Sequence, residues 1–249
     1  MFRHTALFLG YELRNTARNP IWPLFGILQP VLYMLLFAPL LANTTPGVPQ
    51  SETLTQFTPG MMVMIALFGS MFVGFGMITE IRNGVLERLA VSPASRPAIV
   101  LGRTLRDVIV LIAQALVIAA LGTLMGMRPS LPGLLLMVLL MALIGTFASG
   151  LSYGLALALR DENGMSQIMQ LFALPLILLT GILLPMSLAP EWMRAVATFN
   201  PLYHTVEAGR ALFGGDLSNT SIPLAFGLML VLALVTVRWS VSSMRRLAG

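Results

Sequence analysis

The chain contains no lysine and no cysteine, and it carries few charges of either sign. Only 10% of its 249 residues are charged and 57% are hydrophobic, and all 15 basic residues are arginine. A soluble domain usually carries about 25% charged residues. This chain therefore has too few charges to cover a water-exposed surface, and its composition predicts a polytopic membrane protein.

Each of these absences excludes a kind of site. The common phosphate-binding loop of ATPases needs a lysine to reach the nucleotide, so any ATP and Mg must be bound by another chain. Without cysteine there is no disulfide framework and no thiolate metal site. The only histidines, His4 and His204, lie far apart in sequence, which argues against a histidine metal site. We therefore expect no cofactor on this chain.

Long apolar stretches indicate the membrane-spanning helices. A helical span needs about 20 mostly apolar residues, and the charges of this chain fall between such stretches. We expect an all-α domain over residues 21–249 with six transmembrane helices. The predicted spans are residues 21–42, 57–79, 108–127, 132–159, 168–189 and 222–241.

The arginines are distributed unevenly between these spans. They gather before residue 21, in the 80–107 connection and in the C-terminal tail, whereas the 43–56 connection has none. Cytoplasmic connections carry the excess of basic residues, so both termini are predicted to be cytoplasmic. The net charge of +5 fits loops that face anionic lipid. It gives no reason to expect a nucleic-acid partner.

Residues 1–20 are expected to form an amphipathic helix in the cytoplasmic membrane interface. Apolar residues recur there at helical spacing, most charged residues fall off that stripe, and Asn19-Pro20 would end the helix. A signal peptide fits less well, because the apolar run begins late and is too long. The predicted stripe is formed by Phe2, Ala6, Leu9, Leu13 and Ala17.

The longest cytoplasmic connection, residues 80–107, carries charges of both signs. Its helical character is predicted to continue to Ala90, and Ser92-Pro93 breaks it. A second helix is expected to begin after Pro97. A short amphipathic segment that bends between two spans, here called the elbow, suits docking to a soluble subunit. A solvated loop with a positive-inside excess explains the pattern equally well.

Residues 186–221 contain two short helical patterns that are too charged to span a membrane and too apolar for a free outer loop. We expect a re-entrant helix pair in the outer leaflet, with its irregular backbone covered by protein or water. Two helices lying flat on the membrane are the alternative. The residues predicted to form the pair include Trp192, Asn200, Pro201, Tyr203, Glu207 and Arg210.

No ionisable residue falls near the middle of a predicted span, which argues against a proton-coupled carrier. Most uncharged polar residues in the spans are expected to form interhelical hydrogen bonds, and a minority to line a substrate path. Pro175, Gly181 and Pro185 predict a kink or break in the fifth span. The candidate path or gate residues are Gln29, Tyr33, Ser70, Phe172, Thr180 and Pro185.

Three stretches carry a resemblance to a known family. Together they resemble the integral-membrane permeases of type 2 ATP-binding-cassette exporters, and most of all the daunorubicin-resistance-type permeases of bacteria. The resemblance covers essentially the whole chain, although Asn83 stands where the family often has an acidic residue. The stretches are Glu80-x-Arg82-x-Gly84-x-Leu86-Glu87-x-Leu89 followed by Ser92-Pro93 and Gly102-Arg103; Pro185 through Trp192; and Asn200-Pro201-Leu202 followed by Glu207 and Arg210.

This resemblance implies an exporter permease in the bacterial inner (plasma) membrane that moves an amphipathic drug, lipid or glycan outward by alternating access. It implies a second permease, either a copy of this chain or a sister protein, and two copies of a separate ATP-binding subunit. Residues 80–93 would be the coupling helix, and the 160–167 turn a second ATPase contact. The residues expected to couple to the ATPase are Glu80, Arg82, Gly84, Glu87, Arg88, Asp161 and Glu162.

Three other functions are alternatives to an ATP-driven permease. A secondary carrier predicts a charge at the membrane midplane and often an internal repeat. A non-transport assembly or sensor subunit would not stimulate a partner ATPase. An intramembrane enzyme would need a catalytic base and nucleophile, and no plausible pair is visible. The permease explains the missing lysine, the charges outside the spans and the charged elbow together.

Overall fold

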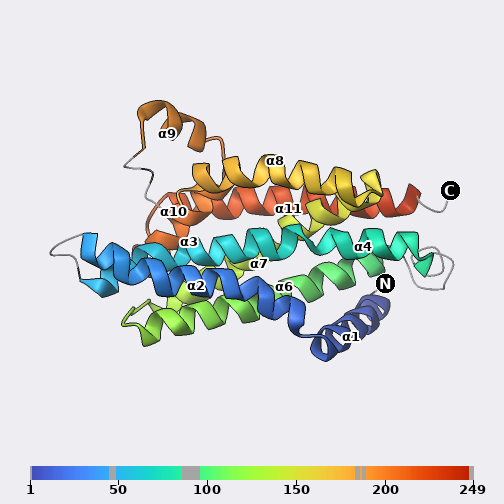
Figure 1. The fold of residues 1–249 in the computed structure, drawn as a ribbon, viewed down its shortest axis with the longest axis horizontal. Coiled ribbons are helices and arrows are strands. Elements are labelled where there is room, and N and C mark those ends of the chain that lie inside the picture. The colour runs from blue at the N-terminus through green and yellow to red at the C-terminus, as the bar shows by residue number, and fades with distance from the viewer. Residues whose placement is uncertain (1, 45–48, 86–95, 183–185, 187–188, 247–249) are drawn as a thin grey trace.

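The computed structural model describes residues 2–44, 49–85, 96–182, 186 and 189–246, and its regular elements in these ranges are all helices. The all-α prediction is confirmed for this part of the chain. The helices (Figure 1) are α1 (Phe2–Arg18), α2 (Ile21–Thr44), α3 (Gln50–Met71), α4 (Val73–Arg82), α6 (Arg96–Leu124), α7 (Leu131–Leu159), α8 (Glu162–Thr180), α9 (Glu191–Ala197), α10 (Pro201–Gly214) and α11 (Ser221–Arg246).

Five helical segments are long and apolar enough to cross a membrane. The helices α1 and α2 meet that test only together, as a pair bent by 65°. The chain therefore has five candidate spans, or up to six if the bent pair counts as one, and the predicted first span over residues 21–42 stays a prediction. The five segments are Gln50–Arg82, Pro97–Leu124, Leu131–Leu159, Glu162–Thr180 and Ser221–Arg245.

The long helices lie side by side in one elongated bundle (Figure 1). The helix α1, the end of α4 and the last turns of α11 lie at one end of the bundle, and α9 and α10 lie at the other. The start of α1 and the end of α11 are therefore at the same end, and the prediction that this end is cytoplasmic is not tested. We call the end with the termini the N/C end and the opposite end the α10 end.

Glycines on α7 let neighbouring helices approach closely. A Cβ atom on Gly154 would collide with the Trp239 ring of α11, and one on Gly133 would collide with the Leu212 carbonyl oxygen of α10. A third, on Gly145, would lie 2.6 Å from Leu111 of α6. Small residues favour close packing between membrane helices, and α7 consequently packs closely against α6, α10 and α11.

The second span is broken at Phe72, between α3 and α4. The Ser152 hydroxyl of α7 reaches into the break, where it donates a hydrogen bond to the Met71 carbonyl oxygen at 2.5 Å. The same hydroxyl accepts a hydrogen bond from the Gly74 amide at 2.9 Å. A side chain inserted into a helical hydrogen-bond ladder is a recognised cause of a sharp kink. This break was not predicted from the sequence.

The fifth span differs from its predicted boundaries of 168–189. The helix α8 begins at Glu162, continues through Pro175 and ends at Thr180. Gly181 then adopts a left-handed conformation with φ 70°, which glycine adopts without a steric penalty. The prediction of a break near Gly181 is confirmed, whereas a helix continuing beyond residue 180 is wrong. Pro185 lies outside the described residues.

The structure places a turn at the start of the predicted elbow. The helix α4 ends at Arg82, Gly84 follows in a left-handed conformation with φ 66°, and Val85 is again helical. The helical character predicted as far as Ala90 therefore stays a prediction. Most of the predicted coupling helix, including Glu87 and Arg88, lies outside the described residues. The helix predicted after Pro97 is confirmed, because α6 begins at Arg96.

Candidate functional site

Three of the predicted coupling residues meet at the N/C end. Arg82, at the end of α4, lies 3.5 Å from an Asp161 carboxylate oxygen and 3.4 Å from one of Glu162. Asp161 is held in place as the N-cap of α8, since its side chain accepts a hydrogen bond from the Gly164 amide at 2.7 Å. This ion-paired group of Arg82, Asp161 and Glu162, which we call the surface triad, joins the end of the second span to the α7–α8 turn.

The surface triad is half-exposed, so its energetic weight is small. Exposed ion pairs of this kind contribute about 0.2–1 kcal/mol each. Its significance is geometric, because it fixes two segments far apart in sequence in one arrangement at the surface. Any partner that contacts α4 here also meets the start of α8.

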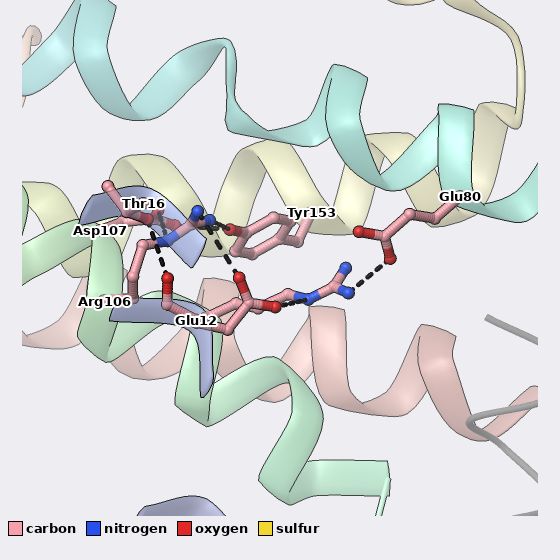
Figure 2. A network of polar contacts seen from close by, with 7 residues as sticks. Glu12, Thr16, Glu80, Arg106, Asp107 and Tyr153 are labelled. Atoms are coloured by element: carbon pink, nitrogen blue, oxygen red, sulfur yellow. Dashed lines mark hydrogen bonds and ion pairs between the residues drawn. The ribbon is translucent and has the colours of Figure 1, made fainter. Parts of the chain in front are cut away.

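The predicted coupling residue Glu80 points into the protein. Its carboxylate pairs with Arg103 of α6, and Arg103 Nε also donates to Glu12 Oε1 of α1 at 3.1 Å. Glu80 therefore belongs to a buried polar cluster rather than to the surface triad. We use "polar cluster" for Glu12, Glu80, Arg103, Arg106, Asp107 and Tyr153 (Figure 2).

The inner half of the polar cluster is centred on Asp107. The Tyr153 hydroxyl of α7 donates to Asp107 Oδ2 at 2.6 Å, and Arg106 Nε lies 2.8 Å from Asp107 Oδ1. Arg106 also donates to the Tyr153 oxygen at 3.2 Å and lies 3.7 Å from Glu12. The cluster thus connects α1, α4, α6 and α7 at the N/C end.

The polar cluster lies toward one end of its span. Because α6 begins at Arg96, the residues Arg103, Arg106 and Asp107 lie within the first eleven residues of the 28-residue segment Pro97–Leu124, at the N/C end. The prediction that no ionisable residue falls near the middle of a span is therefore not contradicted. The signal in the sequence for this polar cluster is the spacing of residues 103, 106 and 107, which places three charges on one helical face.

Removing one partner from such a cluster is expected to be costly. Glu12, Arg103 and Asp107 are buried. Breaking a buried ion pair by deleting one side typically costs about 3–5 kcal/mol, because the other charge is left uncompensated. Arg103 contacts two carboxylates, so this one side chain connects both α1 and α4 to α6.

The α10 end is held by Arg210. Its Nη2 donates to the Gly181 carbonyl oxygen at 2.7 Å, and its Nε donates to the Gln56 carbonyl oxygen at 3.1 Å. Its Nη1 donates to Glu207 at 2.5 Å. Arg210 therefore ties α10 to the first turns of α3 and to the end of α8. Burial raises the pKa of the nearby Tyr203 phenol, Glu207 raises it further, and Arg210 opposes them.

The two helices predicted in residues 186–221 are present, but they differ in their surroundings. The helix α10 begins at Pro201, is capped by the Asn200 side chain and packs into the bundle. The helix α9 projects from the bundle (Figure 1), with its Trp192 69% exposed and Phe199, just after the helix, 88% exposed. The pair is therefore one packed and one exposed helix, and its re-entrant role stays a prediction.

The predicted path residues that the structure describes do not line one common cavity. Gln29 donates to Tyr33 at 3.3 Å along α2, and Phe172 is exposed on α8. Ser70 and Thr180 are buried among other helices. A cavity of about 60 Å³ between α3, α7, α8 and α10 is lined by none of these side chains. Their proposed role in a substrate path gains no support from the described residues.

Comparison with known proteins places the chain in a family. The sequence model described as "ABC-2 type transporter" matches residues 4–213, which is most of the chain. The chain belongs to this family. The match includes the polar cluster, the surface triad and Arg210. It therefore indicates a transmembrane transport subunit rather than an enzyme.

Individual relatives agree with this placement. The chain is 25% identical to "Daunorubicin resistance ABC transporter permease protein DrrB1" from Streptomyces coeruleorubidus, over 85% of this chain and 77% of the relative. It is 28% identical to "Putative transport permease ycf38" from Cyanophora paradoxa, over 79% and 69%. It is 24% identical to "Probable doxorubicin resistance ABC transporter permease protein DrrC" from Mycobacterium tuberculosis, over 88% and 80%.

Proposed function

We propose that this ABC-2 type chain is the permease subunit of an ATP-driven exporter that moves amphipathic drugs, lipids or glycans outward by alternating access. Family membership supports the permease role. Two relatives named for daunorubicin and doxorubicin resistance support an amphipathic drug as cargo. The absence of lysine supports a separate chain as the site of ATP and Mg binding.

The observation that carries the coupling proposal is the surface triad. Arg82 joins the end of the second span to Asp161 and Glu162, so both segments meet at one surface that a partner can contact. We propose that two copies of an ATP-binding subunit dock at the N/C end, against this surface and the 86–95 connection. The N/C end would then face the cytoplasm of the bacterial inner membrane, and a second permease would complete the exporter.

The first test asks whether an ATPase accompanies the chain. The tagged protein is purified gently from its native membrane, and co-purifying chains are identified by mass spectrometry. A soluble subunit with a GxxxxGK[ST] motif supports the proposal, and any second permease in the sample decides between homodimer and heterodimer. Repeated purification without an ATPase, also in milder detergent, would instead favour a carrier or a sensor subunit.

The second test concerns the surface triad. Arg82→Glu should lower ATPase-coupled transport severalfold, because it places three carboxylates together. Asp161→Arg combined with Arg82→Glu should restore part of the loss, because the pair is re-formed with its charges exchanged. Arg128→Glu, an exposed change on the α6–α7 turn, is the control. Equal transport by Arg82→Glu and the control would show that the surface triad does not contribute to coupling.

A further inference from the structure

A groove at the N/C end lies between α1 and the end of α4. Its volume is about 320 Å³, within the range of about 300–1,000 Å³ that is usual for small-molecule sites. The walls include Leu7 and Tyr11 of α1 and Val85 beyond α4, and the floor includes Glu12, Glu80 and Arg103. The groove does not include any of the predicted path residues.

The floor of the groove presents negative charge. Arg103 faces two carboxylates, and its side chain is only 6% exposed, whereas that of Glu80 is 34% exposed. The neighbouring Arg106 is shared between Asp107 and Glu12, so it adds a third carboxylate to the count as well as a second guanidinium. The whole polar cluster contains three carboxylates against two guanidinium groups. With these groups ionised, the polar cluster carries one excess negative charge. A ligand in the groove reaches this charge most easily at Glu80, the most exposed of the three carboxylates.

The walls of the groove are apolar and aromatic. Leu7 is 65% exposed and Tyr11 is 66% exposed. The Tyr11 ring packs edge-on against Phe8, with ring centroids 6.2 Å apart. Aromatic faces attract organic cations, and apolar walls attract the body of an amphipathic molecule. The groove therefore combines an aromatic wall with a carboxylate floor.

We propose that this groove binds amphipathic organic cations, with the cationic centre at Glu80 and the apolar body against Leu7, Tyr11 and Val85. Amphipathic anions of the same shape are excluded, because the floor repels them. If the chain is an exporter permease, this is a site at which cargo is first held on the cytoplasmic side. The assignment as cargo rests on the proposed function, whereas the binding itself does not.

Tetraphenylphosphonium and tetraphenylborate form a probe pair of matched shape and opposite charge. Equilibrium binding is measured on the full chain in lipid nanodiscs, and the signal of empty nanodiscs is subtracted. The phosphonium should bind saturably and the borate should not. Glu80→Gln should weaken phosphonium binding about fivefold, since one partly exposed charge pair is worth about 1 kcal/mol. Glu52→Gln, on an exposed carboxylate of α3, is the matched control and should change nothing.

The absence of cysteine allows the site to be located directly. Single variants Leu7→Cys and Val85→Cys place a unique thiol on the groove wall, and Leu124→Cys places one at the far end of α6, where the native side chain is 83% exposed. The phosphonium should slow maleimide labelling of the two groove variants and leave the Leu124→Cys variant unaffected. This measurement does not depend on the folding of a Glu80 variant.

The inference fails if the borate binds like the phosphonium, or if Glu80→Gln binds as tightly as the control. It also fails if labelling is slowed equally at all three cysteines, which indicates partition into lipid. Failure of the proposed function is a separate result. Saturable phosphonium binding without an ATPase partner would support the proposed binding groove and contradict the proposed exporter function.

Discussion

Replacing Ser152 with alanine tests how the break in the second span is held. The Ser152 hydroxyl satisfies two backbone groups at once, the Met71 carbonyl oxygen at 2.5 Å and the Gly74 amide at 2.9 Å. Ser152, Met71 and Gly74 are all buried. Ser152→Ala therefore leaves a donor and an acceptor without this partner, away from water.

The expected loss follows from these two contacts. A buried backbone group left unsatisfied costs about 1–3 kcal/mol, so two give about 2–6 kcal/mol. Hydrogen bonds between membrane helices average about 0.6 kcal/mol and reach about 1.7 kcal/mol, because partners are also found in the unfolded state. The lower end of the range of about 2–6 kcal/mol therefore applies. We expect Ser152→Ala to lower the free energy of unfolding by about 2–3 kcal/mol.

Ser149→Ala is the matched control, one turn earlier on the same helix. Ser149 is equally buried, but its hydroxyl donates only a long bond of 3.4 Å to Thr146 of its own helix. Unfolding is followed by intrinsic fluorescence of the three tryptophans in a detergent titration. Equal stabilities of Ser152→Ala and Ser149→Ala would refute the reasoning. A loss confined to Ser152→Ala would support it.

Three further predictions concern packing, the α10 end and topology. Gly154→Ala should destabilise by about 1–3 kcal/mol, because its Cβ would collide with a tryptophan ring, whereas Gly227→Ala on α11 meets no described atom within 4 Å and should not destabilise. Arg210→Met should cost about 2–4 kcal/mol by losing three hydrogen bonds, and the exposed Arg194→Met should stay within about 0.5 kcal/mol; equal unfolding midpoints would contradict this. A reporter fused after Gly249 should be cytoplasmic, and a periplasmic signal would contradict the six-span arrangement.

The sequence predicted the helices better than the places where they bend. Apolar stretches of membrane length and local end signals such as Asn200-Pro201 are properties of neighbouring residues, so they can be read along the chain. The break at Phe72 depends on Ser152, which is distant in sequence. Pro175 suggested a kink, yet α8 continues through it. Membrane helices tolerate proline when neighbouring groups satisfy the freed carbonyl.

The candidate site was only partly predictable, because local motifs can be read along the chain whereas contacts between distant residues cannot. Arg82 was expected to matter from a local motif, but its pairing with Asp161 and Glu162 requires the end of α4 to meet the α7–α8 turn. Glu12 looked like a charge on the polar face of an interfacial helix. It is buried because α1 packs against α6. Charge pairing across helices cannot be deduced until the helices are placed.

Because the second span is broken at Phe72, a rotation of α4 about that residue would move the other end of the helix at Arg82. From Phe72 to Arg82 the helix is about 15 Å long, at about 1.5 Å per residue. A swing of about 10° at the break would therefore carry Arg82 sideways by about 2.6 Å. That displacement is nearly as large as the 3.4–3.5 Å contacts of Arg82 with Asp161 and Glu162. A rotation of this size at Phe72 would therefore be sufficient to lengthen or break both ion pairs of the surface triad.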